Sequence, residues 1–175
     1  MKNRYMTITI VLLFIFQFGF VPQAEAFLFH ATHRAVAKRI MKQGFSKARM
    51  RASARFGKGV YASTKKKTAL AEGRGATVIR LKEGKYIRRN SIDLSNPTPA
   101  KLKKVSGEQD LRGKVKKGII DPKLGQKLGK AASERGKIIR YRSARDPKGT
   151  NIFVPKNVYR KHPGIVKADR ISGGR

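Results

Sequence analysis

Apolar positions occur either in short runs or at helical spacing along most of the chain. Short apolar or alternating runs predict strands at residues 27–31, 60–62, 76–81, 85–88, 137–141 and 151–154. Val36, Ile40 and Met41 recur at helical spacing, which predicts a helix that Thr32 caps and Gly44 ends. Strands mixed with short helices favour an α+β fold.

Three further helices are expected. Thr64 is a candidate cap for a helix that runs to Glu72, and a short helix is expected at residues 99–105. Asp121 and Pro122 have the composition of an N-cap followed by a first helical residue, and Gly136 would end that helix. The polar segment from residue 161 to 175 is expected to be a flexible basic tail.

The first 26 residues differ in composition from the rest. Lys2 and Arg4 precede an apolar run, and small residues follow it at Ala24 and Ala26. This pattern is typical of a secretory signal peptide cleaved after Ala26, and it predicts a secreted or periplasmic protein. An uncleaved membrane anchor is the alternative, although the run is shorter than the roughly 20 residues a spanning helix needs. The expected domain then covers residues 27–160.

The charge of the chain is extreme. Its 42 Lys and Arg residues against 10 Asp and Glu residues give a formal net charge of +32. Such a surface indicates a polyanionic partner, which would be a nucleic acid, an acidic protein or an anionic envelope surface, unless the charge serves only solvation. The absence of cysteine excludes thiolate zinc sites and cysteine nucleophiles. Three scattered histidines do not indicate a metal site.

Motifs in the front half follow one another in a specific order. They are His30-Ala31-Thr32, Gly44-Phe45 and Gly57-Lys58-Gly59-Val60-Tyr61-Ala62-Ser63. In this order they resemble the ADP-ribosyltransferase superfamily, in its diphtheria-toxin and poly(ADP-ribose)-polymerase-like branch. The resemblance implies a split β-sheet core with short flanking helices, and NAD as the substrate.

The same resemblance implies an NAD-binding set: His30, Thr32, Gly57, Gly59 and Tyr61. His30 would bond to a ribose of NAD, Tyr61 would stack on the nicotinamide ring, and the glycines would let the backbone approach the nicotinamide amide. A half-buried strand histidine and an ordinary strand tyrosine are the alternatives for His30 and Tyr61.

The back half resembles the RES-domain toxins, which degrade NAD. The segments that carry this resemblance are Tyr61-Ala62-Ser63, Ala69-Leu70-Ala71-Glu72, Ile139-Arg140-Tyr141-Arg142-Ser143-Ala144-Arg145 and Gly149-Thr150-Asn151-Ile152. Most active transferases of the superfamily place a glutamate at the start of the last core strand, where this chain has Asn151. RES toxins also have an arginine where this chain has His30.

Four residues are therefore candidates for the catalytic positions: Tyr61, Ser143, Asn151 and Glu72. For Glu72, the alternative is a solvated helix residue. The sequence favours an exported NAD-cleaving effector or toxin that transfers ADP-ribose to a macromolecular acceptor. Hydrolysis of NAD by a RES-like glycohydrolase is an alternative. A basic, non-catalytic protein that binds nucleic acid or the cell envelope is another.

Overall fold

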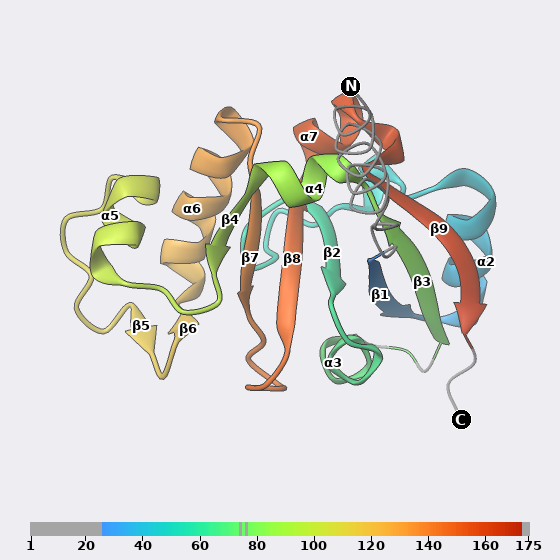
Figure 1. Ribbon diagram of the computed structural model, residues 1–175, viewed down its shortest axis with the longest axis horizontal. Coiled ribbons are helices and arrows are strands. Elements are labelled where there is room, and N and C mark those ends of the chain that lie inside the picture. Colours follow the sequence, from blue (N-terminus) through green and yellow to red (C-terminus); the bar gives the residue numbers. More distant parts are fainter. Residues whose placement is uncertain (1–25, 74, 76, 173–175) are drawn as a thin grey trace, which may run out of the picture.

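A seven-stranded mixed β-sheet forms the centre of the molecule. The computed structural model describes residues 26–73, 75 and 77–172. The strands lie in the order β4-β7-β8-β2-β1-β3-β9, and all neighbours are antiparallel except β4 and β7 (Figure 1). Their bounds are β1 Phe27–Thr32, β2 Gly59–Ser63, β3 Thr77–Glu83, β4 Ser91–Leu94, β7 Ile138–Arg142, β8 Thr150–Pro155 and β9 Val166–Ser172. A small hairpin pairs β5 (Val115–Lys116) with β6 (Ile119–Ile120).

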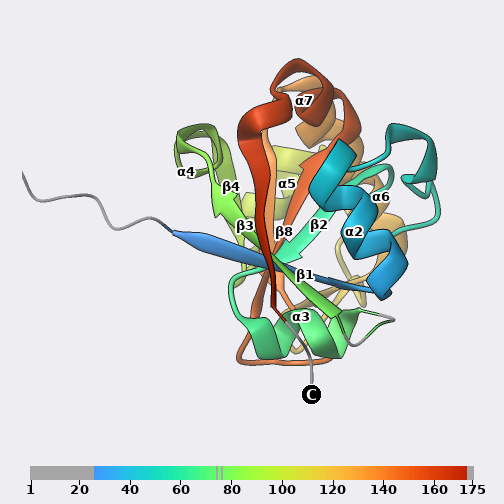
Figure 2. The same cartoon turned by 90° about the vertical axis from the view of Figure 1, so that its right-hand side faces the viewer.

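Short helices surround this sheet. They are α2 Arg34–Gln43, α3 Lys66–Glu72, α4 Lys85–Asn90, α5 Pro99–Ser106, α6 Pro122–Glu134 and α7 Lys156–Lys161, with 3-10 turns at Lys47–Arg49 and Pro163–Ile165. Helix α3 lies across one end of β1 and β2, and α7 lies at the opposite end (Figure 1). Figure 2 shows α2 and α6 on one side of the sheet and α4 on the other. Within the described ranges, no helix has the length and hydropathy required to cross a membrane.

The sheet is divided at its middle. Strands β1 and β2 share a single residue pair, Phe29 with Ser63, whereas β1 and β3 pair over their whole length. One core cluster extends across both halves, because it contains Leu28 and Ile79 together with Ile138 of β7 and Ile152 of β8. A second cluster, with Leu128, Ile139 and Phe153, packs on the opposite face of β7 and β8. The predicted α+β class and the split sheet are therefore confirmed.

Helix α6 forms as the sequence predicts. Asp121 accepts hydrogen bonds from the backbone amides of Lys123 and Leu124, and Pro122 occupies the first helical position. A Cβ at Gly129 would lie 1.9 Å from the carbonyl oxygen of Phe56, so only glycine lets the loop before β2 pack directly on this helix. This close approach fixes the position of residues 52–57 beside the sheet.

Several predicted elements are wrong. Residues 85–90 form helix α4 and not a strand, and Ile87 is the apolar residue that this helix buries. The expected loose tail instead forms β9, which pairs with β3 from Val78↔Ser172 to Glu83↔Val166. Thr64 does not cap α3, because its hydroxyl donates to the carbonyl of Thr150. The N-cap position of α2 is occupied by His33 and not by Thr32.

Candidate active site

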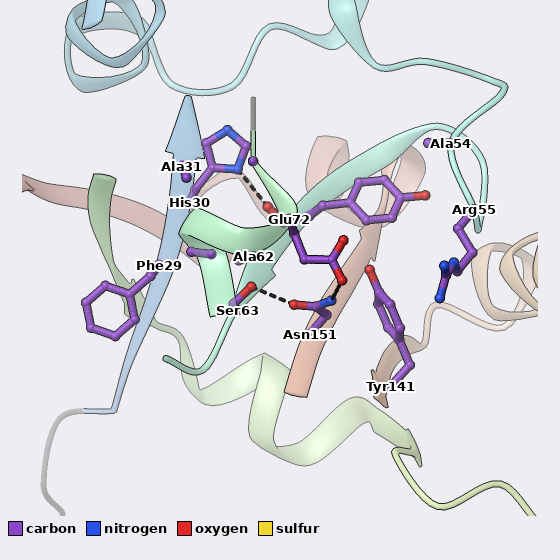
Figure 3. Close-up of a pocket in the computed structure, with 13 residues that line it drawn as sticks. Phe29, His30, Ala31, Ala54, Arg55, Ala62, Ser63, Glu72, Tyr141 and Asn151 are labelled. Carbon is purple, nitrogen blue, oxygen red and sulfur yellow. Dashed lines mark hydrogen bonds between the residues drawn. The ribbon is translucent and has the colours of Figure 1, made fainter. Parts of the chain in front are cut away.

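A cavity of about 250 Å3 opens where the two halves of the sheet separate. Strands β1, β2, β7 and β8, the end of α3 and the loop before β2 all contribute to it (Figure 3). Its chemically active lining residues are His30, Arg55, Tyr61, Glu72, Tyr141 and Asn151. Four of the residues predicted for catalysis or NAD binding, His30, Tyr61, Glu72 and Asn151, are thus brought together here.

One carboxylate oxygen of Glu72 accepts three hydrogen bonds. The Ser143 hydroxyl donates to Oε1 at 2.5 Å, and the Ala144 amide and the Asn151 side-chain Nδ2 each donate at 3.1 Å. Asn151 is itself oriented by Ser63, whose hydroxyl donates to Oδ1 at 2.6 Å. The second carboxylate oxygen of Glu72 points into the cavity (Figure 3). Glu72 is therefore not the solvated helix residue that the sequence left as an alternative.

Packing explains why Glu72 lies at this point. A Cβ at Gly73 would lie 2.5 Å from the Cβ of Ala31, so the end of α3 rests directly against β1. Ser143 follows the end of β7 and is fully buried. Its hydroxyl also accepts hydrogen bonds from the amides of Arg145 and Asp146. These bonds hold the turn after β7 in place, and the Ser143 hydroxyl therefore reaches the Glu72 carboxylate.

Tyr61 lines the cavity, and both ends of its side chain are held in place. Its hydroxyl accepts from the amide of Phe56 and donates to the carbonyl of Gly57, both at 2.9 Å. The ring packs against Phe153 with a centroid distance of 5.0 Å. Burial raises the pKa of Tyr61 well above its ordinary value. The hydroxyl therefore remains protonated and engaged with the backbone.

His30 is held as a neutral imidazole. Burial lowers its pKa below the ordinary value of 6.5, although the bond to the Tyr61 carbonyl acts in the opposite direction. Nδ1 lies 2.8 Å from that carbonyl oxygen, which can only accept, so Nδ1 carries the proton. Nε2 is then left as an acceptor. The edge of the ring also contacts Phe45, at 5.1 Å between centroids.

Arg55 is a residue of the cavity that the sequence reasoning missed. Its Nη1 atom is buried, yet it has no hydrogen-bond partner among the residues that the structure describes. Gln126 of α6 donates to the carbonyls of Ala52 and Ala54 and so holds the loop that carries Arg55. A buried N–H donor without a partner is costly, so Nη1 of Arg55 is available to an acceptor that enters the cavity.

The remaining predicted NAD-binding residues lie elsewhere. Thr32 and Gly59 line an adjoining hollow of about 500 Å3, which shares His30 and Tyr61 with the cavity. Gly57 lines neither space, but its carbonyl holds Tyr61. A Cβ at Gly59 would lie 2.3 Å from the Phe153 ring, so packing alone requires glycine there. In the described part of the chain, no three His, Asp or Glu side chains cluster as metal ligands would.

Comparisons with known proteins agree with this geometry. A family model described as the RES domain matches residues 27–170. The fold is similar to that in the crystal structure of the M. tuberculosis MbcT-MbcA toxin-antitoxin complex. That similarity has a TM-score of 0.50 and 15% sequence identity, and it covers 85% of this chain and 84% of the other. A search of curated proteins gave no match.

These matches correct the predicted location. The chain was expected to be secreted or periplasmic, but the homologous RES toxins of toxin–antitoxin systems are cytoplasmic, so that prediction is wrong. The signal peptide predicted for residues 1–26 lies, apart from its last residue, outside the described residues.

Proposed function

The chain belongs to the RES domain family, and from this membership we propose that it cleaves the bond between nicotinamide and ribose in NAD. The observation that carries the proposal is the carboxylate of Glu72. It is held by Ser143 and Asn151 at the wall of an aromatic-lined cavity. A fixed carboxylate next to an aromatic ring suits a reaction in which a flat heterocycle leaves and positive charge develops on a ribose.

The proposed reaction develops positive charge on the ribose, next to the Glu72 carboxylate. The bond between the ribose C1′ and the nicotinamide nitrogen breaks, and its electron pair leaves with nicotinamide. C1′ then carries positive charge, which the free oxygen of Glu72 stabilises while a nucleophile attacks the opposite side. The three donors on Oε1 hold the carboxylate in one orientation. Asn151 then replaces the usual strand glutamate as a group that positions the helix-borne Glu72.

Size and charge suggest how the substrate lies. The cavity of about 250 Å3 suits the nicotinamide ribose half, with Tyr61 against the nicotinamide ring. The adjoining hollow of about 500 Å3, lined in part by Arg39, Arg49 and Arg51, suits the adenosine half. Arg55 would then pair with the diphosphate, because phosphate oxygens satisfy a guanidinium well.

Water is the acceptor we propose first, so that the protein degrades NAD. The RES-domain match over residues 27–170 favours this reading over transfer to a macromolecule. The similarity to the MbcT-MbcA complex suggests a toxin that a protein partner neutralises. Transfer of ADP-ribose remains the second candidate, since a net charge of +32 would attract a nucleic acid or an acidic protein acceptor.

The test measures nicotinamide release from NAD by the full chain, beside Glu72→Gln. We expect the variant to lose about 100-fold or more of the rate, since the amide supplies no negative charge. Glu134→Gln is the matched control, because Glu134 is an exposed carboxylate of α6 outside the cavity. Circular dichroism checks that each protein is folded.

A label in the adenine of NAD separates the two reactions. Soluble labelled ADP-ribose indicates hydrolysis, whereas label precipitated with protein or nucleic acid indicates transfer. Folded wild-type protein that neither releases nicotinamide nor binds NAD would contradict the proposal. The non-catalytic basic binder would then be the better description.

A further inference from the structure

A second cavity, of about 380 Å3, lies between the Gly57 turn, α6 and α7. It shares no lining residue with the candidate active site. Four cationic side chains from these three elements line it: Lys58, Lys130, Lys156 and Arg160. We refer to it as the basic cavity.

The positive charge of the basic cavity is not neutralised within the described chain. No Asp or Glu is among its lining residues. The ion pairs found among the described residues use other cations, such as Arg80 with Asp169 and Lys127 with Glu108. Four like charges around one space repel one another, and a bound anion would remove that repulsion.

Backbone contacts fix the positions from which these cations extend. The amide of Lys156 donates to the carbonyl of Lys58 at 2.9 Å, which joins α7 to the start of β2. Helices α6 and α7 are joined by a reciprocal pair: the Ser133 hydroxyl donates to Asn157, and the Asn157 amide donates back to the Ser133 carbonyl. The cavity is therefore a formed feature of the fold.

We propose that the basic cavity is a second binding site, which takes phosphate groups of a nucleic-acid backbone. Lysine ammonium groups bind phosphate well as point charges, and Arg160 adds a fork of donors. The aromatic residues of the cavity, Phe56 and Phe153, are only 2% and 1% exposed. They offer neither a stacking surface for bases nor an aromatic anchor for a protein partner.

Contact limited to phosphates makes the binding independent of base sequence. A free polyphosphate has the same chemistry, but a long nucleic acid also benefits from the charge on the rest of the molecule, which is +32 overall. A nucleic acid therefore fits both the local cavity and the global charge. An acidic protein fits only the charge.

The experiment measures fluorescence anisotropy of a short labelled DNA duplex with the full chain at several salt concentrations. The test variant is Lys58→Gln/Lys130→Gln/Lys156→Gln. The control Lys38→Gln/Lys42→Gln/Lys103→Gln removes three exposed lysines that lie outside the basic cavity. We expect the test variant to weaken binding about tenfold or more relative to the control, and to reduce the salt slope by about 2.7. Two duplexes of unrelated sequence should bind alike.

Three outcomes would overturn the proposal. Equal losses in the test and control variants would mean that binding is spread over the whole surface. Binding of tripolyphosphate to the cavity without binding of the duplex would identify a free polyphosphate as the ligand. Tighter, lysine-dependent binding of polyglutamate would identify an acidic protein. Because the cavity is separate from Glu72, nicotinamide release by the test variant should remain near the wild-type rate, which keeps this test independent of the proposed reaction.

Discussion

Ser143 donates a 2.5 Å hydrogen bond to Glu72 from a position 71 residues further along the chain. The bond joins the turn after β7 to the last residue of α3. It places a buried hydroxyl behind a carboxylate whose other oxygen faces the cavity (Figure 3). The bond makes Ser143 a positioning residue for Glu72 in the proposed reaction.

Ser143→Ala tests this relationship. We expect the kcat for nicotinamide release to fall about tenfold to 100-fold with little change in KM, because Glu72 keeps its place in the fold and loses its orientation. The free energy of unfolding should fall by about 1–3 kcal/mol, since the amides of Arg145 and Asp146 also lose their acceptor. Urea unfolding measures that loss. Ser53→Ala, at an exposed serine that lines neither the cavity nor the adjoining hollow, should leave both quantities unchanged.

Two substitutions at Tyr61 separate its ring from its hydroxyl. Tyr61→Phe keeps the ring and loses the bonds to Phe56 and Gly57, so we expect a loss of about 1–3 kcal/mol in unfolding free energy with cleavage of NAD largely retained. Tyr61→Ala also removes the ring and should abolish cleavage. Steady-state rates and chemical unfolding measure the two effects. If Tyr61→Phe were as inactive as Tyr61→Ala, the hydroxyl would have a direct chemical role.

Arg55→Met should change stability and binding in opposite directions. Methionine removes the buried Nη1 atom that has no hydrogen-bond partner, so thermal unfolding without ligand should occur at the same or a higher temperature. The KM for NAD should rise about tenfold or more, because the proposed phosphate partner is lost. Nicotinamide riboside, which lacks the diphosphate, is the control substrate. An equal rise in KM for both substrates would argue against a phosphate contact.

The stability of the protein should depend on pH through His30. Its folded pKa lies below 6.5, so the unfolded chain binds a proton more readily than the folded protein does. Stability from this residue is complete above pH 6.5 and is lost as the pH falls below that value. Melting temperatures of the wild type and His30→Gln, compared from neutral to acidic pH, measure the effect. The wild type should lose more stability than the variant, and parallel curves would contradict a depressed pKa.

The resemblance to known families was enough to name Glu72, Ser143 and Asn151 as alternatives for one polar catalytic position. The structure joins all three by hydrogen bonds. Their hydrogen bonds could not be predicted, because they depend on how the end of α3 rests against β1. The motif glycines have roles that the sequence did not indicate, since Gly59 is required by the Phe153 ring.

Arg55 was missed because its position is set by distant contacts. The basic segment around it has no period, and the contacts that fix the loop come from α6, where Gln126 and Gly129 lie more than 70 residues away. Strand β9 was missed for another reason. It is an edge strand whose residues are mostly polar, so it lacks the alternation that marks a half-buried strand. Helix α4 is six residues long, too short for its apolar spacing to distinguish a helix from a strand.

The two sides of the split sheet are synthesised at different times, so Glu72 is made well before its hydrogen-bond donors. A growing chain emerges with β1, β2 and Glu72 first, but all three donors to Glu72 come from residues 143–151. Strand β9, which completes the other half of the sheet, is made last of all. The carboxylate therefore gains all three donors only after residue 151 has been synthesised. A nascent chain shorter than this lacks the groups that orient the proposed catalytic carboxylate.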